Sequence, residues 1–258
     1  MKRLFWLLTI LIVLTACDGH ALPGAATAAP GGTWVPSQPT ATPRPSSNFR
    51  LLTVPVGGDV ILSGAFYPPA SSPAPAVLLL HQVGGQKEDW AQFATRLQAA
   101  GYAVLALDLR GHGESGGEAE WAAMADDVAR AWEALTAQPE VDAERTAIVG
   151  ASIGANLALV AGAALPWVRA VVLLSPGLDY RGVRTEEAML AYGNRAVLIA
   201  ASQDDAYACS SAQTLDQMAQ GEHALALYAQ AGHGIEMLQR QPDLNDLILG
   251  WLRTRLGQ

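Results

Sequence analysis

Cysteine, charge and long apolar runs are all scarce in this 258-residue sequence. Its two cysteines are Cys17 and Cys209, and a bridge between them would tie a folded domain only to its own N-terminal tail. We therefore expect a free, buried thiol at Cys209 and no disulfide framework. No group of His, Cys and Asp residues has metal-ligand spacing, so the sequence predicts neither a metal ion nor a cofactor.

Basic residues are in the minority. There are 16 Lys and Arg against 24 Asp and Glu, which gives a formal net charge of −8. This balance argues against nucleic acid, or an anionic membrane surface, as a partner of the folded domain. Charged residues make up only 16% of the chain and apolar residues 50%. That composition is typical of a parallel sheet covered by helices on both faces.

The N-terminal segment has the pattern of an export signal. Lys2 and Arg3 precede an apolar run over residues 4–14, which is shorter than the ~20 apolar residues needed to cross a bilayer. Residues 1–16 are therefore typical of a signal peptide. The residues up to Cys17 resemble the bacterial lipobox, in which the cysteine is lipidated and becomes the mature N-terminus. An ordinary signal peptide followed by a chance cysteine is the alternative.

A tether and one domain are expected after the signal peptide. Residues 17–48 are rich in Ala, Pro, Thr and Ser, which predicts a disordered tether. We expect an exported protein held at the outer face of the bacterial cell membrane by lipidated Cys17, with no other membrane contact. Residues 49–258 are long enough for one α/β domain.

Strand-like and helix-like segments alternate through this domain. Residues 49–67 have the pattern of an antiparallel hairpin that turns at 57–59. The strand-like stretches 76–80, 102–107, 146–149 and 169–175 then alternate with helical ones, which is typical of a doubly wound, mostly parallel sheet. Only 20 residues separate the strand that ends near 175 from the one that starts near 196. That length leaves room for a short helix over 186–192 but not for a cap domain, so the site is expected to be open.

The most informative motif is G-x-S-x-G from Gly150 to Gly154, centred on Ser152. It lies between an apolar strand and an Ala-rich helix, which is the setting of a nucleophile elbow. A serine held in a strained strand-to-helix turn needs small neighbours two residues to either side, because the two backbones come very close there. Ser152 is therefore the candidate nucleophile, and a small-residue packing turn is the structural alternative.

A serine hydroxyl needs a base to take its proton and an acid to orient that base. On this scaffold the acid and the histidine follow the serine in that order, each after a later strand. Asp204 and Asp205 follow the predicted strand 195–201, and His233 follows the predicted strand 223–229 between two glycines. We assign His233 as the base and Asp205 as the acid. Asp204 remains the alternative, and the second carboxylate is expected to be solvated or to cap the next helix.

An oxyanion hole requires two backbone N–H donors. The N–H of Ile153, the residue after the nucleophile, is the first candidate. The second follows the apolar strand 76–80, in the loop that begins His81-Gln82-Val83 and continues with two glycines. We assign it to the N–H of Val83, with Gln82 as the alternative, and we expect His81 to be structural. This loop contains no phosphate-binding glycine motif.

With these motifs in order, residues 50–257 resemble the α/β-hydrolase family, in its lidless dienelactone-hydrolase-like and carboxylesterase-like branches. A further element of the resemblance is D-x-R-G-H-G-x-S from Asp108 to Ser115, a tight turn that the resemblance assigns to the scaffold. Gln82 departs from the pattern, because these enzymes commonly have glycine after the histidine.

The motifs predict a serine hydrolase that cleaves small-molecule carboxylic esters through an acyl-enzyme and is expected to be a monomer. A peptidase or amidase with the same machinery is the first alternative. A non-catalytic binding module that keeps the fold is the second. The presence of Ser152, Asp205 and His233 in the required order argues against the binding module, because a decayed site should lack at least one of them.

Overall fold

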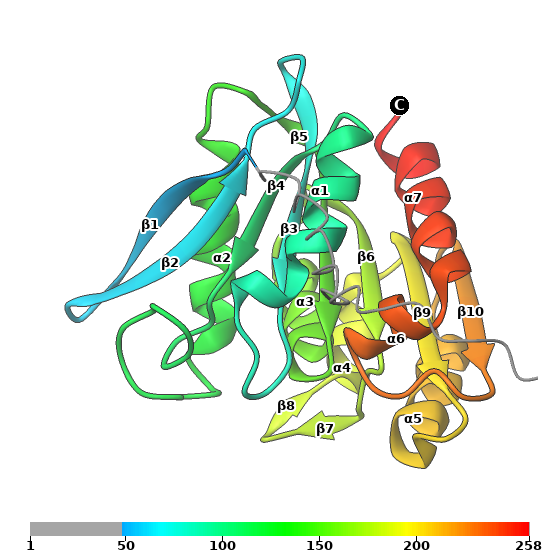
Figure 1. Cartoon of the computed structure of the whole chain (residues 1–258). Coiled ribbons are helices and arrows are strands. Elements are labelled where there is room, and N and C mark those ends of the chain that lie inside the picture. The colour runs from blue at the N-terminus through cyan, green and yellow to red at the C-terminus, as the bar shows by residue number, and fades with distance from the viewer. Residues whose placement is uncertain (1–47, 258) are drawn as a thin grey trace, which may run out of the picture. The chain divides into compact units, whose positions relative to one another are not determined.

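The computed structural model describes residues 48–257. The predicted signal peptide, the lipidation site at Cys17 and the predicted tether up to residue 47 lie outside the described residues. The domain is a sheet of eight strands in the order β1-β2-β4-β3-β5-β6-β9-β10, with helices on both faces (Figure 1). A second, two-stranded sheet pairs β7 with β8.

The main-sheet strands have the following bounds: β1 Arg50–Gly57, β2 Val60–Tyr67, β3 Ala74–Leu80, β4 Ala103–Leu107, β5 Val141–Ala151, β6 Val168–Leu174, β9 Ala196–Ser202 and β10 His223–Tyr228. The small sheet consists of β7 Asp179–Tyr180 and β8 Val183–Arg184. The helices are η1 Lys87–Trp90, α1 Ala91–Ala99, α2 Met124–Thr136, α3 Ile153–Ala164, α4 Glu186–Tyr192, α5 Ala206–Met218, α6 Glu236–Arg240 and α7 Pro242–Leu256.

The pairing of the strands confirms the doubly wound α/β architecture. β1 and β2 form the predicted antiparallel hairpin, with positive φ at all three residues of its turn, 57–59. β2 also pairs antiparallel with β4, and every pairing from β4 to β10 is parallel. Strand β5 begins at Val141, five residues before the predicted strand. The β7–β8 hairpin is an element that the sequence did not predict.

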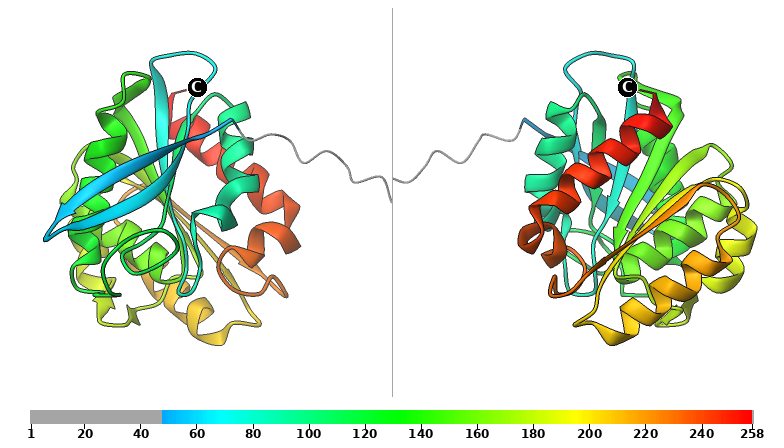
Figure 2. Two further views of the ribbon diagram at one scale, coloured as in Figure 1. Left: turned by 60° about the vertical axis from the view of Figure 1, so that its left-hand side comes forward. Right: turned by 90° about the vertical axis from the view of Figure 1, so that its right-hand side faces the viewer.

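Two apolar layers cover the sheet. In β3, Leu78 and Leu80 pack into the layer under α2, α3 and α5, whereas Val77 and Leu79 pack into the layer under α1 and α7. Because successive residues of a strand point to opposite faces, a strand covered on both sides must be apolar throughout, and all seven residues of β3 are buried. The two helical layers can be followed in Figure 2.

The strand order positions the site. Because β3, β5, β6 and β9 are parallel and adjacent, their carboxyl ends meet at one edge of the sheet. The segments that follow them carry Val83, Ser152, Ser175 and Asp205.

Within residues 48–257, no helix is both long and apolar enough to cross a membrane. Cys209 is a free cysteine. It is half-buried, so the expectation of a fully buried thiol was wrong.

Candidate active site

Ser152 lies in the sharp turn between β5 and α3. Its φ of 56° and ψ of −120° are left-handed, and its N–H donates to the carbonyl of Leu174 at 2.8 Å. A Cβ on Gly150 would lie 2.0 Å from the carbonyl oxygen of Gly154. A Cβ on Gly154 would lie 2.3 Å from the carbonyl oxygen of Leu80. The close backbone approach that the G-x-S-x-G spacing predicts is therefore confirmed.

Asp205 contacts the imidazole of His233. The distance between Asp205 Oδ2 and His233 Nδ1 is 2.5 Å. Asp205 Oδ1 accepts the N–H of Ala208 at 3.2 Å, so the same carboxylate caps α5. The cap and the imidazole together hold the carboxylate in one orientation. This turn places Asp205, and not Asp204, beside the histidine.

Asp204 is exposed and supports the loop around His233. Its carboxylate is exposed, but it accepts a hydrogen bond from the Ser202 hydroxyl and another from the N–H of Gly232 at 3.3 Å. The Ser202 hydroxyl is the main cause that lowers the pKa of Asp204, and the Gly232 N–H adds to it. Of the two alternatives expected for this carboxylate, exposure to solvent is therefore the one observed, and the helix cap is Asp205.

The loop around His233 is held by side chains that follow three different strands. Four of its N–H groups donate to such side chains: Ala231 to Ser202 Oγ at 2.7 Å, Gly232 to Asp204 Oδ1 at 3.3 Å, Gly234 to Ser175 Oγ at 2.9 Å and Ile235 to Gln82 Oε1 at 3.0 Å. No motif in the sequence predicts this role for any of the four acceptors. The four acceptors share only their position in the sequence, since each lies at or just after the carboxyl end of a strand.

The loop after β3 carries Val83, the candidate second donor of an oxyanion hole. Among the residues that the structure describes, no backbone carbonyl accepts the N–H of Val83 or of Ile153, and Val83 is exposed. His81 is buried. Its Nε2 accepts the N–H of Leu109 at 3.0 Å. The proton of the neutral imidazole is therefore on Nδ1, which donates to the Gln82 carbonyl at 2.7 Å. Burial lowers the pKa of His81. His81 is thus structural, as predicted.

The turn from Asp108 to Ser115 is part of the scaffold. The Asp108 carboxylate accepts the backbone N–H and the ammonium of Lys87 at 2.6 and 2.7 Å, and the N–H of Glu114 at 2.9 Å. The residues 111–116 also match G-x-G-x-x-G, the spacing of a dinucleotide-binding loop. Here, however, a Cβ on Gly113 would lie 2.3 Å from the Asp108 carboxylate, so this glycine is needed for the turn around Asp108.

The segment between β6 and β9 borders the site. It consists of the β7–β8 hairpin and the predicted short helix α4. Tyr180 on β7 lies edge-on to His233, with 6.4 Å between ring centroids, and its hydroxyl donates to the carbonyl of Ser175 at 3.5 Å. Arg184 pairs with Asp179 at 3.3 Å, and Arg181 lies over the ring of Trp121.

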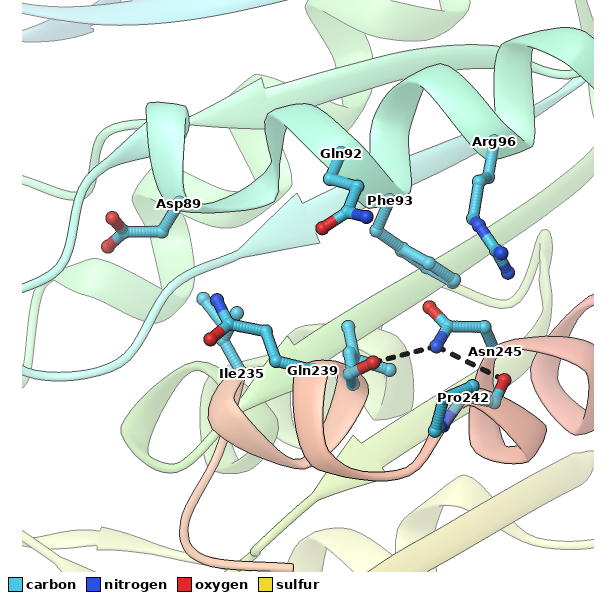
Figure 3. A pocket seen from close by; sticks show the side chains of 9 residues that line it. Asp89, Gln92, Phe93, Arg96, Ile235, Gln239, Pro242 and Asn245 are labelled. Atoms are coloured by element: carbon cyan, nitrogen blue, oxygen red, sulfur yellow. Dashed lines mark hydrogen bonds between the residues drawn. The ribbon is translucent and has the colours of Figure 1, made fainter. Parts of the chain in front are cut away.

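Two hollows lie near these elements. A shallow one of about 480 Å³ is lined by Asp204, Asp205, Gly232, His233, Glu236 and Arg240. A more enclosed cavity of about 230 Å³ lies between α1 and the α6–α7 segment, and it contains none of the predicted site residues (Figure 3). In this cavity the amide of Asn245 donates to the carbonyls of Leu238 and Pro242, closing the corner between α6 and α7.

Within residues 48–257, no cluster of three or more His, Cys, Asp or Glu residues could hold a metal ion.

The fold and the arrangement at the strand ends define an α/β hydrolase. The model of the family described as "Serine aminopeptidase, S33" matches residues 71–245, and the chain belongs to this family. Two uncharacterized proteins of Mycobacterium tuberculosis, from strains CDC 1551 / Oshkosh and ATCC 25618 / H37Rv, are each 35% identical over 147 residues. The match covers 54% of this chain and 51% of each relative, so the chain spans about half the length of the curated relatives it matches.

Solved structures share the fold at low sequence identity. An esterase of Pyrococcus furiosus has a TM-score of 0.72 at 18% identity, with 82% of this chain and 92% of that chain covered. A dienelactone hydrolase from Anabaena variabilis has a TM-score of 0.68 at 22% identity, with 81% and 98% covered. DcsB, solved with its substrate analogue, has a TM-score of 0.73 at 14% identity, with 80% and 99% covered. These likenesses confirm the expected α/β-hydrolase fold.

Proposed function

We propose that this protein is a serine hydrolase that cleaves carboxylic esters. The observation that carries the proposal is the 2.5 Å contact between Asp205 and His233, made at the same sheet edge as a serine in a left-handed elbow. The carboxylate fixes which nitrogen of the imidazole carries the proton, because Nδ1 must donate to Asp205. Nε2 is then the basic nitrogen that a serine nucleophile requires.

The reaction follows from these roles. His233 Nε2 takes the proton of Ser152 as Oγ attacks the ester carbonyl carbon, and the Val83 and Ile153 N–H groups donate to the oxygen that becomes negative. The tetrahedral intermediate collapses, the bond to the alcohol oxygen breaks, and His233 returns the proton to that oxygen. Water then attacks the acyl-enzyme with the same base, which releases the acid and restores Ser152.

The charges around the site favour an ester over a peptide with a free amino terminus. An aminopeptidase needs a carboxylate that is free to bind the substrate ammonium group. In the hollow beside His233, Asp205 contacts the imidazole, Asp204 accepts from Ser202 and Gly232, and Glu236 pairs with Arg240 at 2.6 Å. Each of these carboxylates already has a partner. The peptidase named in the family description is the second candidate function.

Two measurements on the wild type and on Ser152→Ala test this proposal. A fluorophosphonate probe should label the folded wild-type protein at Ser152 and leave Ser152→Ala unlabelled, because only an activated serine reacts with it. A panel of p-nitrophenyl esters and aminoacyl amides should then show turnover of esters and little of amides. Absence of a wild-type adduct would favour a binding module, and faster cleavage of the amides would favour the peptidase.

A further inference from the structure

The side chain of Tyr180 lies between the proposed nucleophile and the proposed base. Its hydroxyl donates to the carbonyl oxygen of Ser175 at 3.5 Å, and the Ser152 side chain is near enough to lower the pKa of the phenol. Its ring meets the ring of His233 edge-on, at an interplanar angle of 85°. None of the reaction steps described above uses this hydroxyl.

The surrounding residues hold Tyr180 in one position. A Cβ on Gly177 would lie 2.7 Å from the Tyr180 ring, so the ring occupies space that only a glycine at 177 leaves free. Tyr207 meets the same ring edge-on at 5.5 Å. The Tyr207 hydroxyl also accepts the N–H of Asp179 and donates to its carbonyl, both at 3.0 Å. The β7 backbone next to Tyr180 is therefore anchored on α5.

The phenol stays protonated over the range in which a serine hydrolase works. Burial raises the pKa of Tyr180 above its ordinary value, and the nearby Asp205 and Tyr207 raise it further, against a smaller opposing effect of the Ser152 side chain. A neutral phenol has one O–H to donate. Tyr180 is thus a hydrogen-bond donor, not a second base.

The strand order places this donor on one particular side of Ser152. In the sheet, β5 lies between β3 and β6, so the strands that lead to the Val83 loop and to the Tyr180 segment flank the strand that leads to Ser152 on opposite sides. Tyr180 follows the strand on the side of β9 and β10, which lead to Asp205 and His233, and its ring meets that of His233. The alcohol oxygen of an ester must also lie on that side, because it receives its proton from His233.

We infer that the Tyr180 hydroxyl is a further catalytic residue, which donates a hydrogen bond to the leaving alcohol oxygen. This inference rests on the proposed ester hydrolysis. As the tetrahedral intermediate collapses, the electron pair of the breaking carbon–oxygen bond moves to the alcohol oxygen. The proton comes from His233 Nε2, and Tyr180 keeps its own proton while stabilising the negative charge that develops before proton transfer is complete.

The test is Tyr180→Phe, measured with esters of one acid and a series of alcohols from ethanol to p-nitrophenol. The variant should lower kcat/KM for the ethyl ester roughly 10- to 100-fold, the range expected for one hydrogen bond to a charged group. For the p-nitrophenyl ester the loss should be under about 3-fold, because that oxygen carries its negative charge easily and gains little from a donor. The value of kcat/KM is the relevant one, since the alcohol leaves during acylation.

Tyr228→Phe is the matched control. It removes the same atom from a tyrosine whose hydroxyl contacts Asp243, outside the proposed machinery, and it should change neither rate. An equal loss for every alcohol, or no loss, would overturn the role of Tyr180. Fluorophosphonate labelling separates the two proposals: a labelled wild type with unchanged selectivity in Tyr180→Phe refutes only this inference, whereas an unlabelled wild type refutes the hydrolase itself.

Discussion

At the residue scale, Ser152 adopts a backbone conformation that costs free energy. A non-glycine residue with φ near 56° is sparsely populated, and such a conformation costs of the order of 1–3 kcal/mol. The surrounding structure holds it there: the Ser152 N–H donates to Leu174, and the carbonyl of Ser152 accepts the N–H groups of Ala155 and Asn156. The strained turn holds Ser152, which is buried, at the carboxyl end of β5.

The two adjacent aspartates should differ sharply on mutation. Asp205→Asn should lower kcat roughly 10³- to 10⁴-fold, because an amide beside Nδ1 no longer selects the tautomer that leaves Nε2 basic. Asp204→Asn should cost less than about 10-fold, because the amide oxygen still accepts the N–H of Gly232. Steady-state kinetics on one p-nitrophenyl ester would measure both. A large loss in Asp204→Asn with an active Asp205→Asn would make Asp204 the acid.

At the element scale, the packing of α3 against the end of β3 determines whether the elbow can form. Gly154 is in the first turn of α3, and a Cβ there would lie 2.3 Å from the carbonyl oxygen of Leu80 and 2.6 Å from that of His81. Both atoms belong to backbone, which cannot swing aside as the end of a flexible side chain can. Any side chain at 154 must therefore push α3 away from the backbone at the end of β3.

Gly154→Ala should lower both the free energy of unfolding and the activity. A loss of about 1–3 kcal/mol is expected, as for other overpacked sites, and urea denaturation followed by circular dichroism would measure it. Gly250→Ala is the control, because Gly250 is exposed in α7 and a Cβ at that position would meet no other atom within 4 Å. That change should stabilise the protein by up to about 1 kcal/mol. If both variants behaved alike, the contact with Leu80 would not control the elbow.

At the scale of the whole molecule, a buried ion pair joins the two segments that follow β3 and β4 at the carboxyl edge of the sheet. Lys87 of η1 and Asp108 after β4 are both almost fully buried, and the Lys87 ammonium also contacts Glu114 and Glu88. Burial by itself lowers the pKa of Lys87. The hydrogen bonds to Asp108, Glu114 and Glu88 outweigh burial, however, and raise the pKa above its ordinary value.

Removing this ammonium should be costly. Lys87→Met should lower the free energy of unfolding at neutral pH by about 3–5 kcal/mol, because Asp108 remains buried without its partner. Since the folded pKa of Lys87 is raised, the contribution is complete below its ordinary value of 10.5 and is lost as the pH rises through the higher folded value. The difference between wild type and variant should therefore be constant near neutrality and shrink in strong alkali.

Urea denaturation across this pH range would measure the effect of Lys87→Met. Arg96→Met is the control, because Arg96 and Asp246 form an exposed pair with 3.8 Å between charged atoms. Such surface pairs contribute about 0–1 kcal/mol. Similar losses in the two variants would contradict the role given to the buried pair.

Local patterns were enough to predict the elbow, the β1–β2 hairpin and the alternation of strands and helices in the main sheet. G-x-S-x-G identifies its turn because the close approach of Gly150 and Gly154 depends only on neighbouring residues. The support of the His233 loop could not be predicted in this way. Gln82 accepts the N–H of Ile235, 153 residues further along the chain, and no spacing in the sequence records such a contact.

What the sequence by itself determined is which residue types follow which strands: a serine after β5, a pair of aspartates after β9 and a histidine after β10. Parallel strands bring those positions to one edge, so the candidates could be named in advance. Only the tertiary structure shows which of Asp204 and Asp205 contacts His233, because adjacent residues in one turn point in different directions. The dihedral angles of that turn direct Asp205 to the His233 ring and Asp204 to the N–H of Gly232.

The tertiary structure also brought Tyr180 into the site, since its place depends on how a two-residue strand packs against Gly177 and Tyr207.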